Sequence, residues 1–467
     1  MKISATREIS GYLTRLEYEQ LSPEAVLKAK HCLLDYIGYT AFGCEEPPAR
    51  ILGATLREMG GKEEATVIGQ PWRLSAVNAA LLNGATGHIA ELDDTHRGTQ
   101  SHPGDSVLAA ALAVAEGQGS TGRKLIAAIV AGYEAAIRVG ESVMPSHYTR
   151  GWHPSGTINT FGAAVAAAKL LSLDEGALTQ AMAIAAGQAA GNFSHLQERG
   201  MTKDLNPGRA AANGVFAALL AANGFTGATN VIENPKGFGA LYSDTFDPDE
   251  LIRGLGGPAR ILEVAHKPFP GCRHLHSSRD ALLATLSEAG KDRPLGPEEV
   301  KQVTARIFST GAAYVDDPAP WEPGKGSYGP TYSTQFNLAL VLQEGEEGLR
   351  RLFDPAYAMA KMQDPGLRRL MEKVEVVHDE ELNRVWPKAW ASEVTLMTTE
   401  GTYTQRVDLP KGEPENPMSY QELKDKFTAL TTPRTFTEEQ GLQIIQAVEQ
   451  LEQTGGTTEL IRLFSSR

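Results

Sequence analysis

The sequence is poor in the residues that mark extracellular, metal-cluster or membrane proteins. Its 467 residues include three cysteines, Cys32, Cys44 and Cys272. An odd number at such wide spacing suggests neither a disulfide framework nor an iron–sulfur cluster. No apolar run is long enough to cross a bilayer, and the N-terminal residues lack the apolar segment of a secretory signal. We therefore expect a cytoplasmic protein that has no membrane partner.

Positive charge is also scarce. The 44 lysine and arginine residues are outnumbered by 57 acidic ones, which gives a formal net charge of −13. This balance argues against nucleic acid or an anionic membrane as a partner. An anionic substrate would need cationic groups that gather locally in one site.

What the sequence has in abundance is alanine and glycine on helical patterns. Residues 1–266 contain a series of Ala-rich segments that end in Gly or Asn, and Ser22 with Pro23 forms a helix start. Residues 267–407 mix helical segments with β-like runs, and the stretch around "TTEGTY" predicts a hairpin. Residues 408–467 are helical again and are expected to complete the first domain. The predicted fold is mainly α, a large all-helical domain with a smaller α+β domain.

Four short polar segments interrupt the apolar helices in the same way. Each places basic residues in a Pro/Gly turn immediately before a helix, whose N-terminus favours carboxylate or phosphate groups. In the segment "TKDLNPG", Asn206 is predicted to cap the helix and Pro207 to begin it. The basic residues of these segments are His102, His153, Lys203, Arg273, His274 and His276. Together they suggest a site for one anionic substrate.

The stretch "HIAELDDTHRGTQSHPGDS" adds acidic groups to this set. If residues 83–96 are helical, His88, Glu91 and Thr95 lie on one face. Histidine and carboxylate groups of this kind can remove and return a proton next to a substrate carboxylate. Lys203 can stabilise the negative charge that develops. No phosphate loop, nucleophile elbow or dinucleotide motif competes with this interpretation.

Simpler interpretations of the same residues remain open. Asp93 and Asp94 are also compatible with a solvated helix end, with Asp94 paired to Arg97. His153 is equally compatible with a packing role. His274 and His276 have the spacing of some zinc ligands, but the sequence shows no third ligand at a diagnostic distance, so no metal is expected.

The sequence resembles the MmgE/PrpD family over nearly its whole length. The motifs that carry the resemblance appear in order along the chain: "LLDYIGYTAFG", "NAALLNGATGHIAELDDTH", "SHPGDSVLAAALAVAE", "GWHPSGTINTFGAAVAAAKLL", "TKDLNPGRAAANGVFAALLAANGFTG", "HKPFPGCRHLHSSRDA" and "LPKGEPENPMSYQELKDKF". The family includes 2-methylcitrate dehydratase, cis-aconitate decarboxylase and iminodisuccinate epimerase.

The resemblance implies a helical main domain, an α+β lid domain, a homodimer, and an active site between the domains with no required cofactor. It implies catalytic roles for His102, Lys203, His276, Glu91, Asp94 and Thr95. The predicted substrate-binding residues are Asp93, His153, Lys267, Arg273 and His274, and His274 competes with His276 for the catalytic role.

This sequence departs from the family pattern at three positions. Glu91 stands where several members carry Asp, Asn206 where a His is common, and Phe336 where a Tyr is frequent. We expect a cofactor-independent lyase or isomerase acting next to a carboxylate of a di- or tricarboxylate, first of all a 2-methylcitrate dehydratase. A cis-aconitate decarboxylase or iminodisuccinate epimerase, a non-catalytic carboxylate-binding protein and a metal hydrolase are the alternatives.

Overall fold

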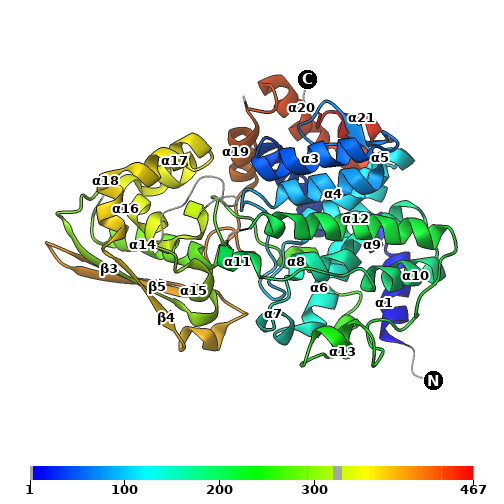
Figure 1. Cartoon of the computed structure of the whole chain (residues 1–467), viewed down its shortest axis with the longest axis horizontal. Helices are drawn as coiled ribbons and strands as arrows, with labels where there is room; N and C mark the ends of the chain where they lie inside the picture. Colours follow the sequence, from blue (N-terminus) through cyan, green and yellow to red (C-terminus); the bar gives the residue numbers. More distant parts are fainter. Residues whose placement is uncertain (1–3, 199, 292, 319–328, 433, 466–467) are drawn as a thin grey trace. The chain divides into compact units, whose positions relative to one another are not determined.

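The computed structural model of the chain describes residues 4–198, 200–291, 293–318, 329–432 and 434–465. The chain is mainly helical, which confirms the predicted class, and it divides into two compact units. Unit 1 comprises Met1–Ile89, Asp93–Val264 and Ser419–Arg467, and unit 2 comprises Ala90–Leu92 and Ala265–Met418. Each unit is described by itself (Figure 1).

Unit 1 is built from helices of many lengths and one short two-stranded sheet. Its helices are α1 Ala5–Arg15, α2 Pro23–Gly43, α3 Pro47–Met59, α4 Ala76–Gly87, α5 Pro103–Gln118, α6 Gly122–Val143, α7 Ser146–Thr149, α8 Pro154–Thr157, α9 Asn159–Leu170, α10 Glu175–Ala186, α11 His195–Glu198, α12 Thr202–Ala222, α13 Phe238–Tyr242, α19 Tyr420–Thr431, α20 Glu438–Glu449 and α21 Thr458–Arg462. The strands β1 Ala65–Thr66 and β2 Arg73–Leu74 are antiparallel.

Glycine and alanine allow the central helices of unit 1 to approach closely. Helix α12 packs against α4 and α9, and α9 also packs against α5 and α6. A Cβ atom on Gly208 of α12 would lie 2.3 Å from the carbonyl oxygen of Leu81 in α4. A Cβ atom on Gly214 would lie 2.5 Å from the Cβ of Ala163 in α9. The Ala-rich composition is thus explained by backbone contact between buried helices.

Unit 2 combines a four-stranded sheet with helices. Its strands are β3 Val300–Phe308, β4 Val374–Asp379, β5 Ser392–Thr398 and β6 Thr402–Val407, and its helices are α14 His276–Glu288, α15 Ser309–Val315, α16 Thr334–Arg351, α17 Pro355–Gln363 and α18 Pro365–Met371. The strand order is β4-β3-β5-β6, with β3 parallel to β4 and the other pairs antiparallel. Strands β5 and β6 form the predicted hairpin. One apolar core, which contains Phe308 and Phe336, holds this sheet and its helices together.

The start of three helices agrees with the sequence. Ser22 caps α2 by accepting a hydrogen bond from the N–H of Ala25, with Pro23 at the first helical position. His102 directly precedes α5, and His153 directly precedes α8.

Two predicted helix features are wrong. Helix α4 ends at Gly87, and Glu91 has a φ of 52°, so residues 88–95 do not continue the helix. A non-glycine residue in this left-handed region breaks an α-helix. Helix α12 begins at Thr202, so Asn206 does not cap it and Pro207 lies inside it. Lys203 is therefore in the first turn of the helix.

Among the described residues, no helix is both long enough and apolar enough to span a membrane.

Two glycine-to-alanine changes test the close packing of unit 1. Gly208→Ala is expected to destabilise the protein by about 1–3 kcal/mol, because the added methyl group meets a backbone carbonyl. Gly117→Ala, on the exposed side of α5 with nothing within 4 Å, is expected to stabilise by about 0.5–1 kcal/mol. Urea unfolding followed by circular dichroism compares both variants with the parent. Equal effects at the two positions would contradict the proposed helix contact.

Candidate active site

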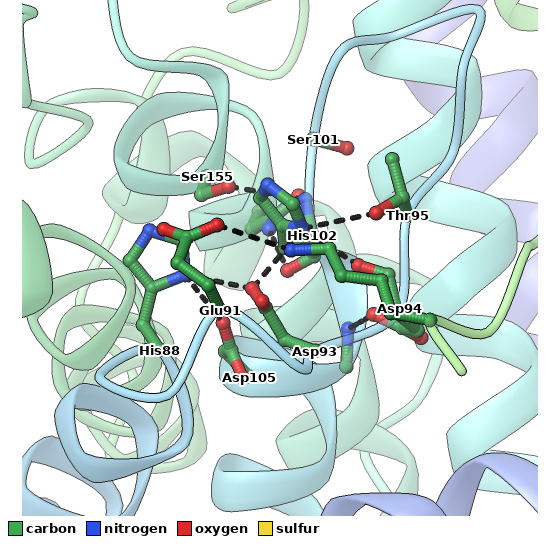
Figure 2. A network of polar contacts seen from close by, with 12 residues as sticks. His88, Glu91, Asp93, Asp94, Thr95, Ser101, His102, Asp105 and Ser155 are labelled. Atoms are coloured by element: carbon green, nitrogen blue, oxygen red, sulfur yellow. Dashed lines mark hydrogen bonds and ion pairs between the residues drawn. The ribbon is translucent and has the colours of Figure 1, made fainter. Parts of the chain in front are cut away.

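The carboxylate of Asp93 lies between two histidines in unit 1, as Figure 2 shows. Its Oδ2 atom is 2.7 Å from Nδ1 of His88 and 3.0 Å from Nδ1 of His102. The two imidazole rings are 5.1 Å apart between centroids. Asp93 is fully buried, so its carboxylate orients both rings, and its charge acts to raise the pKa of His88.

The surroundings of His102 determine which nitrogen carries its proton. Nδ1 is 2.7 Å from the backbone carbonyl oxygen of Asp94, 3.0 Å from Asp93 and 3.3 Å from the hydroxyl of Thr95. A carbonyl oxygen accepts only, so Nδ1 is the donor, and the neutral ring has its lone pair on Nε2. This is the arrangement of a histidine that takes up and returns a proton at Nε2.

The backbone of His102 is fixed from two helices. Its N–H donates to the hydroxyl of Ser155 in α8 at 3.0 Å, and its carbonyl accepts from the side-chain amide of Asn159 in α9 at 2.8 Å. The His102 side chain remains 17% exposed, whereas that of Asp93 is 0% exposed. The ring is thus held in place while still reachable by a small molecule.

The carboxylate of Asp94 contacts other groups than that of Asp93. It accepts from the Tyr133 hydroxyl at 2.6 Å and from the N–H of Gly104, in the first turn of α5, at 2.9 Å. Burial raises the pKa of Asp94 to about 7, although both hydrogen bonds act in the opposite direction. The family resemblance implied a catalytic role for Asp94. In this structure the carboxylate on His102 is that of Asp93, while Asp94 contributes its backbone carbonyl.

His88 joins Asp105 to the same cluster as Asp93. Nδ1 of His88 is also 3.0 Å from Oδ2 of Asp105, and both residues are fully buried. Burial and the nearby Lys203 would lower the pKa of His88, but Asp93 and Asp105 raise it to about 9. Burial and the charge of Asp93 also raise the pKa of Asp105. The cluster therefore retains protons at neutral pH.

Lys203 and His153 belong to the same group of residues in unit 1. The half-buried Lys203 is close enough for its charge to act on both His88 and His153. The His153 ring lies 5.5 Å from the His88 ring. Burial and these neighbouring cationic groups hold the pKa of His153 well below its usual value. The structure thus gathers His102, Lys203 and His153, as the sequence suggested, in one unit.

Unit 2 contains a second group of candidate residues around Glu91. The carboxylate of Glu91 is 3.2 Å from Nζ of Lys267 and accepts from the hydroxyl of Tyr332, and all three are held within this unit. The backbone carbonyl of Glu91 accepts from the N–H of Gly271 at 3.0 Å. These contacts hold Glu91 in its left-handed conformation, which a non-glycine residue adopts only when its surroundings impose it.

Arg273 and His276 are largely engaged inside unit 2. The Arg273 guanidinium donates twice to Glu413, at 2.8 and 3.1 Å, and also to the carbonyl of Lys411 and to Nδ1 of His276. Four of its five N–H groups are therefore used by the protein. Because the guanidinium can only donate, Nδ1 of His276 accepts and Nε2 donates to the carbonyl of Gly271 at 3.2 Å.

His274 has different surroundings from His276. Its ring lies against Trp390, at 4.5 Å between centroids, and against Phe308 and Tyr314. Burial, followed by the charge of Lys267, lowers the pKa of His274 to about 3. Both histidines are thus neutral rings in an apolar or cationic environment, and the choice between them as the catalytic residue remains a prediction.

Two groups of described residues have the composition of a cation site, and neither includes His274 or His276. They are His88, Asp93 and Asp105, and His96, Glu141 and Glu263. Ligands of one tetrahedral zinc ion lie about 3.4 Å from each other, given bonds of about 2.1 Å. The 2.7 Å between His88 and Asp93 is shorter and corresponds to a hydrogen bond. In the second group the Arg260 guanidinium already pairs with both glutamates.

Several residues of these clusters were not among the predicted site residues. They are Asp105, Tyr133, Tyr332 and Glu413; His88 was named with Glu91 and Thr95 for proton chemistry, but no individual role was predicted for it. For His88 and Asp105 a signal existed, since both lie within the polar stretch that also holds His102. Tyr133, Tyr332 and Glu413 reach their partners from distant parts of the chain. Glu413 lies in the last of the quoted family motifs, but nothing in that motif indicates its partner Arg273.

Buried carboxylate–histidine pairs of this kind can take up and return protons. The MmgE/PrpD N-terminal domain model matches residues 7–251, and the MmgE/PrpD C-terminal domain model matches residues 269–453. The chain belongs to the MmgE/PrpD family, as its motifs predicted, and is an enzyme of the lyase type found there.

The chain is similar over nearly its whole length to cis-aconitate decarboxylases. It is 27% identical to that of Homo sapiens, over 98% of this chain and 95% of the relative. It is 26% identical to that of Mus musculus, over 98% and 93%, and 26% identical to that of Aspergillus terreus strain NIH 2624, over 99% and 96%. These relatives favour the decarboxylase alternative over the dehydratase that the sequence put first.

The protonated cluster makes stability dependent on pH. Because the folded pKa of His88 is about 9 and its unfolded value about 6.5, its contribution is complete below pH 6.5 and is lost as pH rises through 9. We expect the free energy of unfolding to fall between pH 7 and 9, by at most ~1.4 kcal/mol per pH unit from this proton. Urea unfolding at a series of pH values measures this slope.

His88→Gln should flatten the slope, whereas His378→Gln, which changes an exposed histidine of unit 2, should leave it unchanged. A His88→Gln variant with the parent slope would show that another group is responsible.

Proposed function

We propose that this enzyme decarboxylates cis-aconitate or a closely similar unsaturated tricarboxylate. The observation that carries the proposal is the near full-length similarity to cis-aconitate decarboxylases from mammals and a fungus. The site geometry supports it, because the reaction needs a proton donor and a cationic group for carboxylates.

The chemistry itself sets what the site must provide. In cis-aconitate, one carboxylate is attached to a carbon next to the double bond. When the bond to that carboxylate breaks, carbon dioxide leaves and the electron pair spreads over the double bond towards a remaining carboxylate. A proton must then be added to carbon, which gives an unsaturated dicarboxylate. The site therefore has to stabilise a delocalised anion and deliver one proton.

His102 is the proposed proton donor. In its charged form it carries a proton on Nε2, while the Nδ1 proton remains bonded to Asp93 and the Asp94 carbonyl. Asp93 stabilises the imidazolium and holds the ring in one orientation, as a buried carboxylate does for a catalytic histidine. Thr95, at 3.3 Å from Nδ1, adds a further contact to the same atom.

Lys203 is the proposed group for substrate carboxylates in unit 1. It lies in the first turn of α12, where the helix N-terminus adds partial positive charge. It brings positive charge near His88 and His153, within a protein of net charge −13. In this role it would hold a carboxylate and stabilise the charge that spreads onto it.

Proton NMR in D₂O tests the reaction directly. With cis-aconitate, we expect new vinyl signals of an unsaturated dicarboxylate, deuterium at the carbon that receives the proton, and release of carbon dioxide. Citrate and 2-methylcitrate, offered separately, should remain unchanged. Turnover of 2-methylcitrate to an unsaturated tricarboxylate, with none of cis-aconitate, would instead establish the dehydratase.

Two variants test the proposed roles. His102→Gln should lower kcat by about 10²- to 10⁴-fold, since general acid–base catalysis contributes that much. Lys203→Met should raise KM and lower kcat together, because it removes a charge used by substrate and transition state. His378→Gln serves as the control. Activity of His102→Gln within a factor of three of the parent would exclude His102 as the proton donor.

A further inference from the structure

Asn206 makes a hydrogen bond to His153 that determines the state of that ring. Its side-chain amide nitrogen is 2.9 Å from Nδ1 of His153. An amide N–H can only donate, so Nδ1 accepts and cannot carry a proton. The ring is therefore neutral, with its single proton on Nε2.

The amide of Asn206 is held in position by close backbone contacts. A Cβ atom on Gly156 would lie 3.1 Å from the Asn206 Cβ, and one on Gly191 would lie 3.2 Å from its Cγ. Gly191 has a φ of 134°, which favours glycine. The backbone N–H of His153 donates to the carbonyl of Gly191 at 3.1 Å, so the same turn fixes both partners.

The charges around His153 agree with a neutral ring. Burial is the largest cause that lowers the pKa of His153, and the nearby His88, His195, Lys203 and His102 lower it further. Lys203 and Asn206 are three residues apart on α12 and so share one face of the helix. One turn of this helix thus supplies a positive charge and the group that keeps the adjacent histidine uncharged.

His102 and His153 consequently present opposite atoms at Nε2. His102 keeps its proton on Nδ1, facing Asp93 and the Asp94 carbonyl, so Nε2 of the neutral ring has the lone pair. His153 has its proton on Nε2 because Nδ1 accepts from Asn206. A carboxylate accepts hydrogen bonds only, so His153 is suited to bind one, whereas His102 is suited to proton transfer.

We propose that Asn206 is a positioning residue: its amide N–H keeps the proton of His153 on Nε2, which makes His153 a hydrogen-bond donor to one carboxylate of the substrate. The statement about the substrate rests on the proposed function, whereas the state of the His153 ring does not.

Nitrogen-15 NMR of the full chain tests the ring state without any substrate. His153→Gln identifies the His153 signals by their loss. In the parent protein at pH 7, Nε2 should be protonated and Nδ1 unprotonated. In Asn206→Asp the new carboxylate can only accept, so Nδ1 should become protonated. A parent spectrum with a protonated Nδ1, or an unchanged spectrum in Asn206→Asp, would overturn the proposal.

Binding of propane-1,2,3-tricarboxylate, a saturated tricarboxylate that lacks the reactive double bond, tests the consequence. Asn206→Leu removes the donor without adding charge, and calorimetry should show binding weakened by about 3- to 10-fold. Asn213→Leu is the matched control on α12, because Asn213 donates to the carbonyl of Gln188 and should have no effect. Equal losses in both variants would refute the positioning role.

The two experiments separate this proposal from the proposed function. If the parent binds the tricarboxylate but does not decarboxylate cis-aconitate, the proposed function fails while the assignment of Asn206 and His153 stands. If decarboxylation occurs and Asn206→Leu binds as the parent does, the role of Asn206 fails while the function stands.

Discussion

The hydrogen bonds of one buried carboxylate, that of Asp93, organise the polar centre of unit 1. A single oxygen lies within 3.0 Å of Nδ1 on both His88 and His102, so it fixes the orientation of two rings at once. A buried charge of this kind is costly unless it is paired. The surrounding elements supply that pairing: α4 ends just before His88, and α5 begins just after His102. Asp105, in the first turn of α5, completes the group.

Differences in protonation among the histidines follow from what each Nδ1 contacts. His102 faces acceptors, His153 and His276 face groups that can only donate, and His274 lies among aromatic rings. A histidine is a proton carrier, a donor or a neutral packing group according to these neighbours. Because all four residues are histidines, the residue type alone does not distinguish these roles.

Comparison of sequence and structure shows where prediction succeeds. The mainly helical class, the β5–β6 hairpin and the start of α2 at Ser22 and Pro23 follow from local patterns, since periodicity and capping act over a few residues. The left-handed conformation of Glu91 and the early start of α12 at Thr202 were missed. At Glu91 the cause is not local: contacts with Lys267, Tyr332 and Gly271, far along the chain, impose the conformation.

The sequence by itself determined the family and the mainly helical class, because family motifs and helical periodicity can be read without knowing which residues are in contact. It also supplied His102, Lys203 and His153 as members of one group. Only the tertiary structure decided that the carboxylate on His102 belongs to Asp93 while that of Asp94 bonds to Tyr133 and Gly104. Adjacent aspartates have the same chemistry, and the backbone course between α4 and α5 alone directs one towards the histidines and the other away.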